Sequence, residues 1–195
     1  TDAAVLACQS ANHEVGTVQP VAEAVEAAGD VPVFVDACAS AGRFPLPEGW
    51  AALAASAHKW GGPPGVGVLV VRRRARWRDP SPEDERASEH GIGFENVPAI
   101  LASAAALQAV VAERETENVR AHALVGWIRR VVGGLPDVEV VGDPTDRLPH
   151  LLTFSCLFVD GEALVTELDR LGFEVASGSA CTSSTLEPSH VLAAM

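Results

Sequence analysis

Hydrophobic residues along the first part of the chain alternate between short strand-like runs and one stretch with helical spacing. Apolar or β-branched runs over 3–8, 31–35 and 65–71 predict buried strands. Apolar positions at helical spacing over 18–28 predict a helix that ends at Gly29. Strands that alternate with a helix are typical of a parallel α/β sheet.

The pattern changes in the second half of the chain. A charged segment rich in Pro and Gly over 76–96 predicts a long surface excursion. The Ala- and Leu-rich stretch over 97–132 then predicts one long helix or two abutting helices. The remainder predicts a small α+β unit made of strands over 138–141 and 151–158, a helix over 161–171 and a short strand into Ala176.

Composition narrows the classes of partner. The chain has 195 residues, 48% of them hydrophobic, and a formal net charge of −12. This charge disfavours binding to nucleic acid or to an anionic membrane surface, so we expect small molecules or proteins as partners. The apolar runs over 65–71 and 151–159 are too short to span a bilayer, and no signal peptide opens the chain. We therefore expect a cytoplasmic location.

The cysteines and histidines lack the spacing of a metal site. Four cysteines lie far apart, so the sequence predicts neither a metal centre nor a disulfide scaffold. Cys8 and Cys156 fall in strand-like runs and are expected to be small core residues. Cys181 lies among Gly, Ser and Thr residues, where an exposed and reactive thiol is expected.

Lys59 and Asp36 are the residues whose positions suggest chemistry. Lys59 precedes a glycine-rich turn and a buried strand, as a Schiff-base lysine in a partly desolvated pocket would. Asp36 ends a predicted strand, where ligands of open α/β sheets bind, and its carboxylate could hold a pyridine nitrogen protonated. Taken alone, such a lysine is usually a solvated loop residue and such an aspartate usually a capping residue.

Four motifs in one order carry a resemblance to a known family. They are Asn12-His13-Glu14-Val15-Gly16-Thr17, Val35-Asp36-Ala37, Ser56-Ala57-His58-Lys59 and Ser177-Gly178-Ser179-Ala180-Cys181-Thr182-Ser183. Together the motifs resemble those of group I cysteine desulfurases, members of the class V aminotransferase superfamily with the pyridoxal-phosphate fold of type I. The resemblance runs through most of the chain.

The resemblance implies a role for each matching residue. Lys59 would hold pyridoxal 5'-phosphate, His58 would assist proton transfer and Ser56 would bind the cofactor phosphate. Asp36 would pair with the pyridine nitrogen, and His13 would contact the phenolic oxygen. Cys181 would take sulfur from L-cysteine as a persulfide, leaving L-alanine, and pass it to a sulfur-acceptor protein. A homodimer is also implied.

The resemblance further implies a division of the chain. Residues 1–113 would form the carboxyl-side part of the cofactor-binding large domain, including the start of a bridging helix. Residues 114–195 would form part of a small α+β domain with the cysteine loop. No phosphate loop or ring-stacking histidine precedes Asn12, so the chain is expected to be part of a longer enzyme and inactive alone.

Three positions depart from the family pattern and keep other functions open, the first being His13, which stands where the family has an asparagine. Ala39 stands where the family has a glutamine, and Phe94 stands where it has a phosphate-binding threonine. One alternative is a class V aminotransferase or lyase that acts on another amino acid. The other is a non-catalytic remnant that dimerises or docks a partner.

Overall fold

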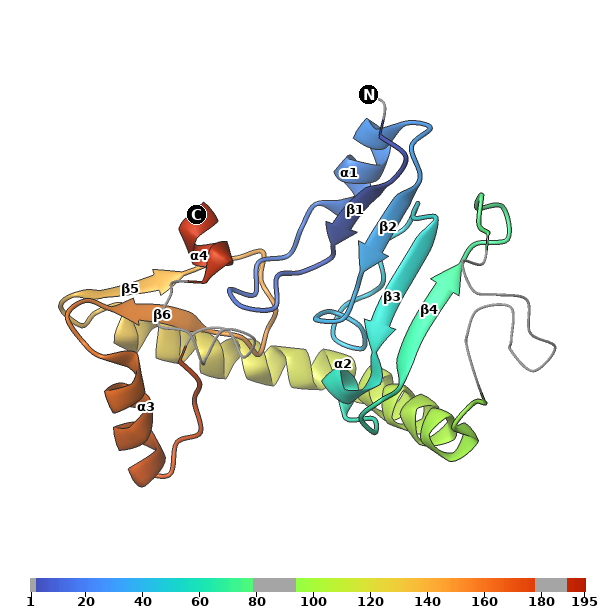
Figure 1. Cartoon of the computed structure of the whole chain (residues 1–195). Helices are drawn as coiled ribbons and strands as arrows, with labels where there is room; N and C mark the ends of the chain where they lie inside the picture. Colours follow the sequence, from blue (N-terminus) through green and yellow to red (C-terminus); the bar gives the residue numbers. More distant parts are fainter. Residues whose placement is uncertain (1–2, 79–93, 178–188) are drawn as a thin grey trace.

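The fold consists of a four-stranded sheet and a two-stranded sheet that share one long helix (Figure 1). The computed structural model describes residues 3–78, 94–177 and 189–195. In chain order the elements are β1 (Leu6–Gln9), α1 (Val21–Ala28), β2 (Val33–Asp36), β3 (Ala52–Ser56), the 3-10 helix η1 (Ala57–Trp60), β4 (Gly67–Val71), α2 (Val97–Val132), β5 (Val138–Val141), β6 (Thr153–Cys156), α3 (Gly161–Arg170) and α4 (His190–Ala194).

The larger sheet is mainly parallel, which confirms the predicted α/β class. Its order is β1-β2-β3-β4, with β1, β2 and β3 parallel and β4 antiparallel to β3. Asp36 at the end of β2 pairs with Gln9 of β1 and with Ala54 of β3. The carboxyl ends of three neighbouring strands therefore meet at one edge of the sheet, where α/β proteins place their ligands.

Strand β3 was missed by the sequence pattern. Its residues read ALAAS, and alanine is the strongest helix former while the segment lacks β-branched residues. The strand nevertheless pairs with β2 on one side and with β4 on the other. Its small side chains let it sit in the sheet centre, with Ala52, Leu53 and Ala55 buried. Strand pairing on both sides therefore overrides the local helical preference.

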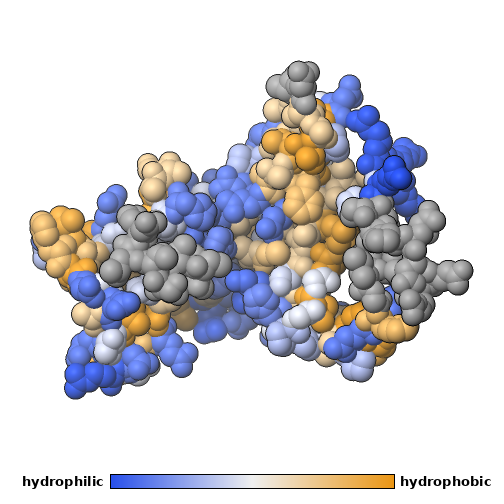
Figure 2. All heavy atoms as spheres, in the orientation of Figure 1, coloured by the Kyte–Doolittle hydropathy of each residue, from blue (hydrophilic) through white to orange (hydrophobic). Residues whose placement is uncertain are grey.

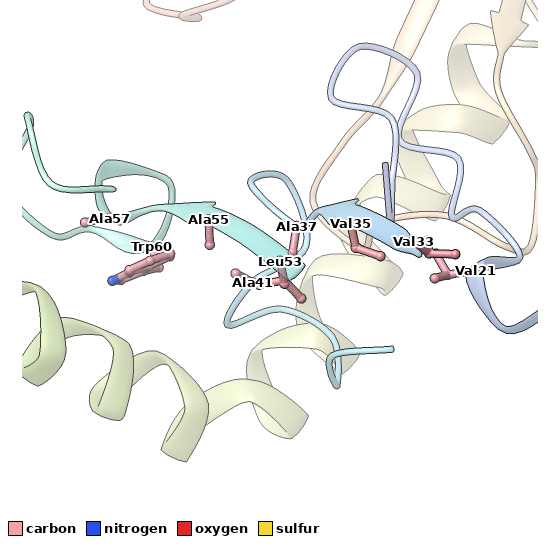
Figure 3. Packing of buried hydrophobic residues seen from close by; sticks show 9 residues of the cluster. All are labelled: Val21, Val33, Val35, Ala37, Ala41, Leu53, Ala55, Ala57 and Trp60. Carbon is pink, nitrogen blue, oxygen red and sulfur yellow. The ribbon is translucent and has the colours of Figure 1, made fainter. Parts of the chain in front are cut away.

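One hydrophobic cluster holds α1, the sheet and η1 together (Figure 3). Val33 and Val35 of β2 are 2% and 0% exposed, and Leu53 of β3 is 2% exposed. Trp60 extends the cluster to the end of η1, where Leu107 and Val110 of α2 pack against it. The turn that carries Lys59 is therefore attached to the core on its Trp60 side.

The stretch over 97–132 forms one helix, α2, so the one-helix alternative is correct. The Asn96 side chain caps it by accepting a hydrogen bond from the Ala99 amide at 3.2 Å, and Pro98 occupies the first turn. The helix contacts η1 and β5, which Figure 1 places toward its opposite ends. Because α2 runs unbroken through residue 113, the proposed domain boundary at 113/114 stays a prediction.

The surface of α2 is unusually apolar. Leu101 is 65% exposed and Val97 is 55% exposed. Figure 2 shows hydrophobic surface over this end of α2 and over the four-stranded sheet. Within the described residues, α2 alone is long and apolar enough to cross a membrane by length and composition, with a mean hydropathy of 1.3 in its most apolar window. The search for continuous apolar runs in the sequence did not identify α2 as long and apolar enough to span a membrane, because its apolar residues are separated by polar ones.

The second unit confirms most of the predicted elements. Strands β5 and β6 pair antiparallel, and α3 begins where Asp160 accepts a hydrogen bond from the Ala163 amide at 2.9 Å. The predicted strand into Ala176 is wrong, because residues 173–176 form no regular structure. A strand requires a hydrogen-bonding neighbour. In the part of the chain described, β5 and β6 pair only with each other.

Candidate functional site

The candidate site forms at the carboxyl ends of β2 and β3. Asp36 is the last residue of β2, and Ser56 is the last residue of β3. Because Asp36 is in register with Ala54, Ser56 extends two residues beyond it on the neighbouring strand. His58 and Lys59 follow directly in η1. Local chain order therefore brings three of the predicted site residues to the strand end next to Asp36.

The backbone of Asp36 is fixed while its side chain stays accessible. Ser10 donates to the Asp36 carbonyl through its amide at 2.8 Å and through its hydroxyl at 3.1 Å. The Ser10 hydroxyl also lies 2.6 Å from the Ser40 hydroxyl, and both serines are buried. The Asp36 carboxylate is exposed and accepts a hydrogen bond from the Cys38 amide at 2.8 Å. This arrangement gives the exposed carboxylate a defined direction.

The Cys38 thiol is affected by the charges of both Asp36 and Lys59. Burial, followed by the hydrogen bond and the negative charge of Asp36, raises the pKa of the Cys38 thiol to about 11. The positive charge of Lys59 acts on the same thiol in the opposite direction. Both predicted residues therefore lie within electrostatic range of the Cys38 thiol. Cys38 itself stays a neutral thiol near pH 7, which makes it a poor nucleophile.

Lys59 is exposed, and the residues on either side of it, His58 and Trp60, are held by hydrogen bonds. The His58 ring is oriented by a 2.9 Å hydrogen bond between its Nδ1 and the Ser56 hydroxyl. Trp60 is 3% exposed and donates its Nε1–H to the Ser103 carbonyl of α2 at 3.1 Å. We call this Trp60–Ser103 contact the tryptophan anchor. It fixes the backbone of Lys59 while the amine remains free to reach a ligand.

Glycines after the anchor allow η1 to approach α2. Gly61 ends η1 with a φ of 84°, a conformation that favours glycine. A Cβ on Gly62 would lie 3.0 Å from the Ala57 carbonyl oxygen and 3.2 Å from the Ser103 Cα. The glycine-rich turn therefore provides close packing of η1 on α2.

His13 occupies a separate loop whose backbone is well defined. The Asn12 side chain accepts hydrogen bonds from the amides of Glu14 and Val15 at 2.9 and 3.0 Å. His13 is exposed, and its Nε2 lies 3.7 Å from Glu14 Oε1. Contact between His13 and a cofactor stays a prediction. Cys181 lies outside the described residues, so its role is likewise untested.

The residues at these strand ends fit pyridoxal phosphate by the chemistry of their side chains. Lys59 provides an amine for a Schiff base, and Asp36 provides an exposed carboxylate suited to a protonated pyridine nitrogen. Ser56 provides a hydroxyl beside them, although its present partner is His58. Across the described residues, no group of three His, Cys, Asp or Glu side chains is arranged to hold a metal ion.

Sequence reasoning gave no role to several residues that build this site. Ser10 and Ser40 fix the Asp36 backbone, and Trp60 anchors the lysine turn. A buried aromatic directly after Lys59 was a usable signal, because a tryptophan at a chain turn usually has a packing partner. The serine pair had no such signal, since its members are 30 residues apart.

A family model and several proteins of known sequence match the chain. The model of the class-V aminotransferases matches residues 1–195. The cysteine desulfurase IscS of Dictyoglomus turgidum is 34% identical over 200 residues, covering 100% of this chain and 51% of that protein. The cysteine desulfurase NifS of Azotobacter vinelandii is also 34% identical, with 100% and 50% covered. This chain therefore spans about half the length of these relatives.

Solved structures agree on the fold. DndA from Streptomyces lividans superposes with a TM-score of 0.81 at 30% identity, covering 100% of this chain and 57% of that one. A NifS-like protein superposes with a TM-score of 0.82 at 24% identity, covering 94% and 52%. The second likeness concerns the fold alone.

Proposed function

Because this chain belongs to the class-V aminotransferase family, we propose that it forms part of a pyridoxal-phosphate-dependent cysteine desulfurase. The observation that carries the proposal is the position of Asp36 at the end of β2 and of Lys59 in η1, directly after the end of the neighbouring strand β3. Similarity to proteins named cysteine desulfurases supports the choice of reaction. Since the chain spans about half the length of these relatives, the activity is proposed for the whole polypeptide.

In this proposal, the side chains at the strand ends hold the cofactor and its substrate. Lys59 provides the attachment amine, and Asp36 holds the ring nitrogen in its protonated form. When bound, pyridoxal phosphate supplies a ring that accepts electron density from the amino acid. His58, oriented by Ser56, is placed to move a proton near the Lys59 amine. The tryptophan anchor keeps that amine at the strand ends.

The sulfur step that we propose uses Cys181 as the acceptor of sulfur from L-cysteine. The Cys181 thiolate attacks the substrate sulfur, the substrate C–S bond breaks and an S–S bond forms. The products are L-alanine and a Cys181 persulfide, and the proton lost by the substrate thiol is balanced by the proton gained at the alanine methyl group. Atoms and electrons balance without an external oxidant. We further propose a homodimer in the cytoplasm that passes this sulfur to an acceptor protein.

The test uses the full-length protein loaded with pyridoxal phosphate. We expect L-cysteine and a reducing thiol to yield alanine and sulfide in equal amounts. Lys59→Ala should abolish both products, and Cys181→Ser should abolish sulfide release while the cofactor absorbance remains. Cys156→Ser is the matched control and should retain activity, because Cys156 lies in β6 of the two-stranded sheet, whereas Asp36 and Ser56 end strands of the four-stranded sheet.

Two results would contradict the proposal. Turnover of another amino acid without turnover of cysteine would favour an aminotransferase or lyase. A full-length protein that binds no pyridoxal phosphate would favour a non-catalytic role in dimerisation or docking.

A further inference from the structure

A buried arginine without a carboxylate partner lies between β5 and β6. Arg147 is 4% exposed, and an isolated bridge joins its backbone to Thr17. Its Nη1 donates to the Leu148 carbonyl at 3.3 Å, and its Nη2 lies 3.1 Å from His122 Nδ1. Within the described ranges, the Arg147 Nε is buried and has no hydrogen-bond partner, and the guanidinium forms no ion pair. Because a buried charge is costly unless it is paired, this guanidinium is well suited to receive an anion.

The arginine lines a cavity of about 370 Å³. Asn118 and His122 of α2 contribute polar atoms to its wall, while Phe44 and Val119 contribute apolar surface. This volume falls within the range of small-molecule pockets. Asn118 lies 15 residues after Ser103 on α2, which corresponds to roughly 22 Å along the helix axis. The cavity is thus well separated from the tryptophan anchor.

Arg147 is the permanently cationic side chain in the lining of this cavity. Burial lowers the pKa of Arg147, and the nearby charge of Arg129 lowers it further. Burial also lowers the pKa of His122, and Arg147 adds to this effect. Asp146 lines the cavity as well, but in the described part of the chain it forms no ion pair with Arg147. The Asp143 carboxylate is engaged with the amides of Thr145 and Asp146.

We propose that this cavity binds a small organic carboxylate, with Arg147 and His122 as its anion contacts. The planar N–H groups of arginine match the two oxygens of a carboxylate. The apolar surfaces of Phe44 and Val119 fit a short hydrocarbon body, which an inorganic anion lacks. Binding of a carboxylate at this cavity does not depend on sulfur transfer. It can therefore be measured without any catalytic turnover.

The test is calorimetric titration of the full-length protein with sodium butyrate at constant ionic strength. Butyrate should bind saturably, whereas butyramide, which has the same shape and no charge, should not. Bound butyrate should raise the pKa of His122 in proton NMR titrations, because a nearby anion favours the charged imidazolium. Arg147→Gln should weaken binding by about tenfold or more, as expected for loss of a charged hydrogen-bonding partner.

Two further variants keep the result interpretable. Arg120→Gln is the matched control, because Arg120 is an exposed arginine of α2 that pairs with Glu117 at 2.8 Å. It should leave butyrate affinity unchanged. Val119→Trp should block the cavity from a side chain that is 73% exposed, so folding should be preserved. The proposal is overturned by absence of saturable binding, by equal binding of butyramide, or by unchanged affinity in both Arg147→Gln and Val119→Trp.

Discussion

The tryptophan anchor provides a direct test of how the fold positions Lys59. In Trp60→Phe the aromatic packing is mostly kept, but the hydrogen bond to the Ser103 carbonyl at 3.1 Å is lost. The lost hydrogen bond costs about 1 kcal/mol. The smaller ring buries less apolar surface, at a further cost of about 1 kcal/mol. We therefore expect the free energy of unfolding to fall by roughly 2 kcal/mol.

Trp60→Ala removes the whole ring from a site where it is 3% exposed. Truncation of a buried tryptophan to alanine lowers the free energy of unfolding by about 3 to 5 kcal/mol. Urea unfolding of the full-length protein, followed by far-UV circular dichroism, measures both changes. Because the anchor holds the backbone of Lys59, Trp60→Phe should also reduce the fraction of pyridoxal phosphate retained after gel filtration.

Trp50→Phe is the matched control for this prediction. Trp50 also donates its Nε1–H to a carbonyl, that of Pro47 at 2.7 Å, but this contact is local to one loop. We expect Trp50→Phe to lower the free energy of unfolding by less than Trp60→Phe does, and the Trp50→Phe protein to retain the cofactor. The reasoning is refuted if Trp60→Phe unfolds at the same urea concentration as the parent protein, or if the control loses as much stability and cofactor.

Two further predictions follow from single contacts. In the cofactor-free protein, Cys38 should react slowly with iodoacetamide at pH 8, because its pKa of about 11 leaves little thiolate; its rate should rise with pH toward that value. Asp36→Asn should accelerate the reaction at pH 8 by lowering this pKa, and an unchanged rate measured by mass spectrometry would argue against their contact. Gly142→Ala should destabilise the protein far more than Gly172→Ala in urea unfolding. Both glycines have a φ above 80°, but only the first would place its Cβ 2.4 Å from the Val15 carbonyl oxygen, so equal costs would exclude that close approach.

The sequence by itself determined the class of the fold and the order of the site residues. β-branched runs at β2 and β4 and the long apolar period of α2 were sufficient, because burial favours these patterns whatever lies nearby. Asp36 could be singled out because it ends a predicted strand. Lys59 could be singled out because it precedes a glycine-rich turn and a predicted strand. The order of the four motifs along the chain then indicated pyridoxal phosphate, a cofactor that the Lys59 amine and the Asp36 carboxylate would bind.

Tertiary structure decided what depends on partners distant in the chain. The alanine-rich β3 became a central strand only because β2 and β4 supply hydrogen bonds on both sides. The segment before Ala176 has no such neighbour among the described strands and stays irregular. The pKa of Cys38 and the unpaired charge of Arg147 likewise arise from side chains brought together by folding. Local pattern cannot encode these features, because each is a property of a pair of segments.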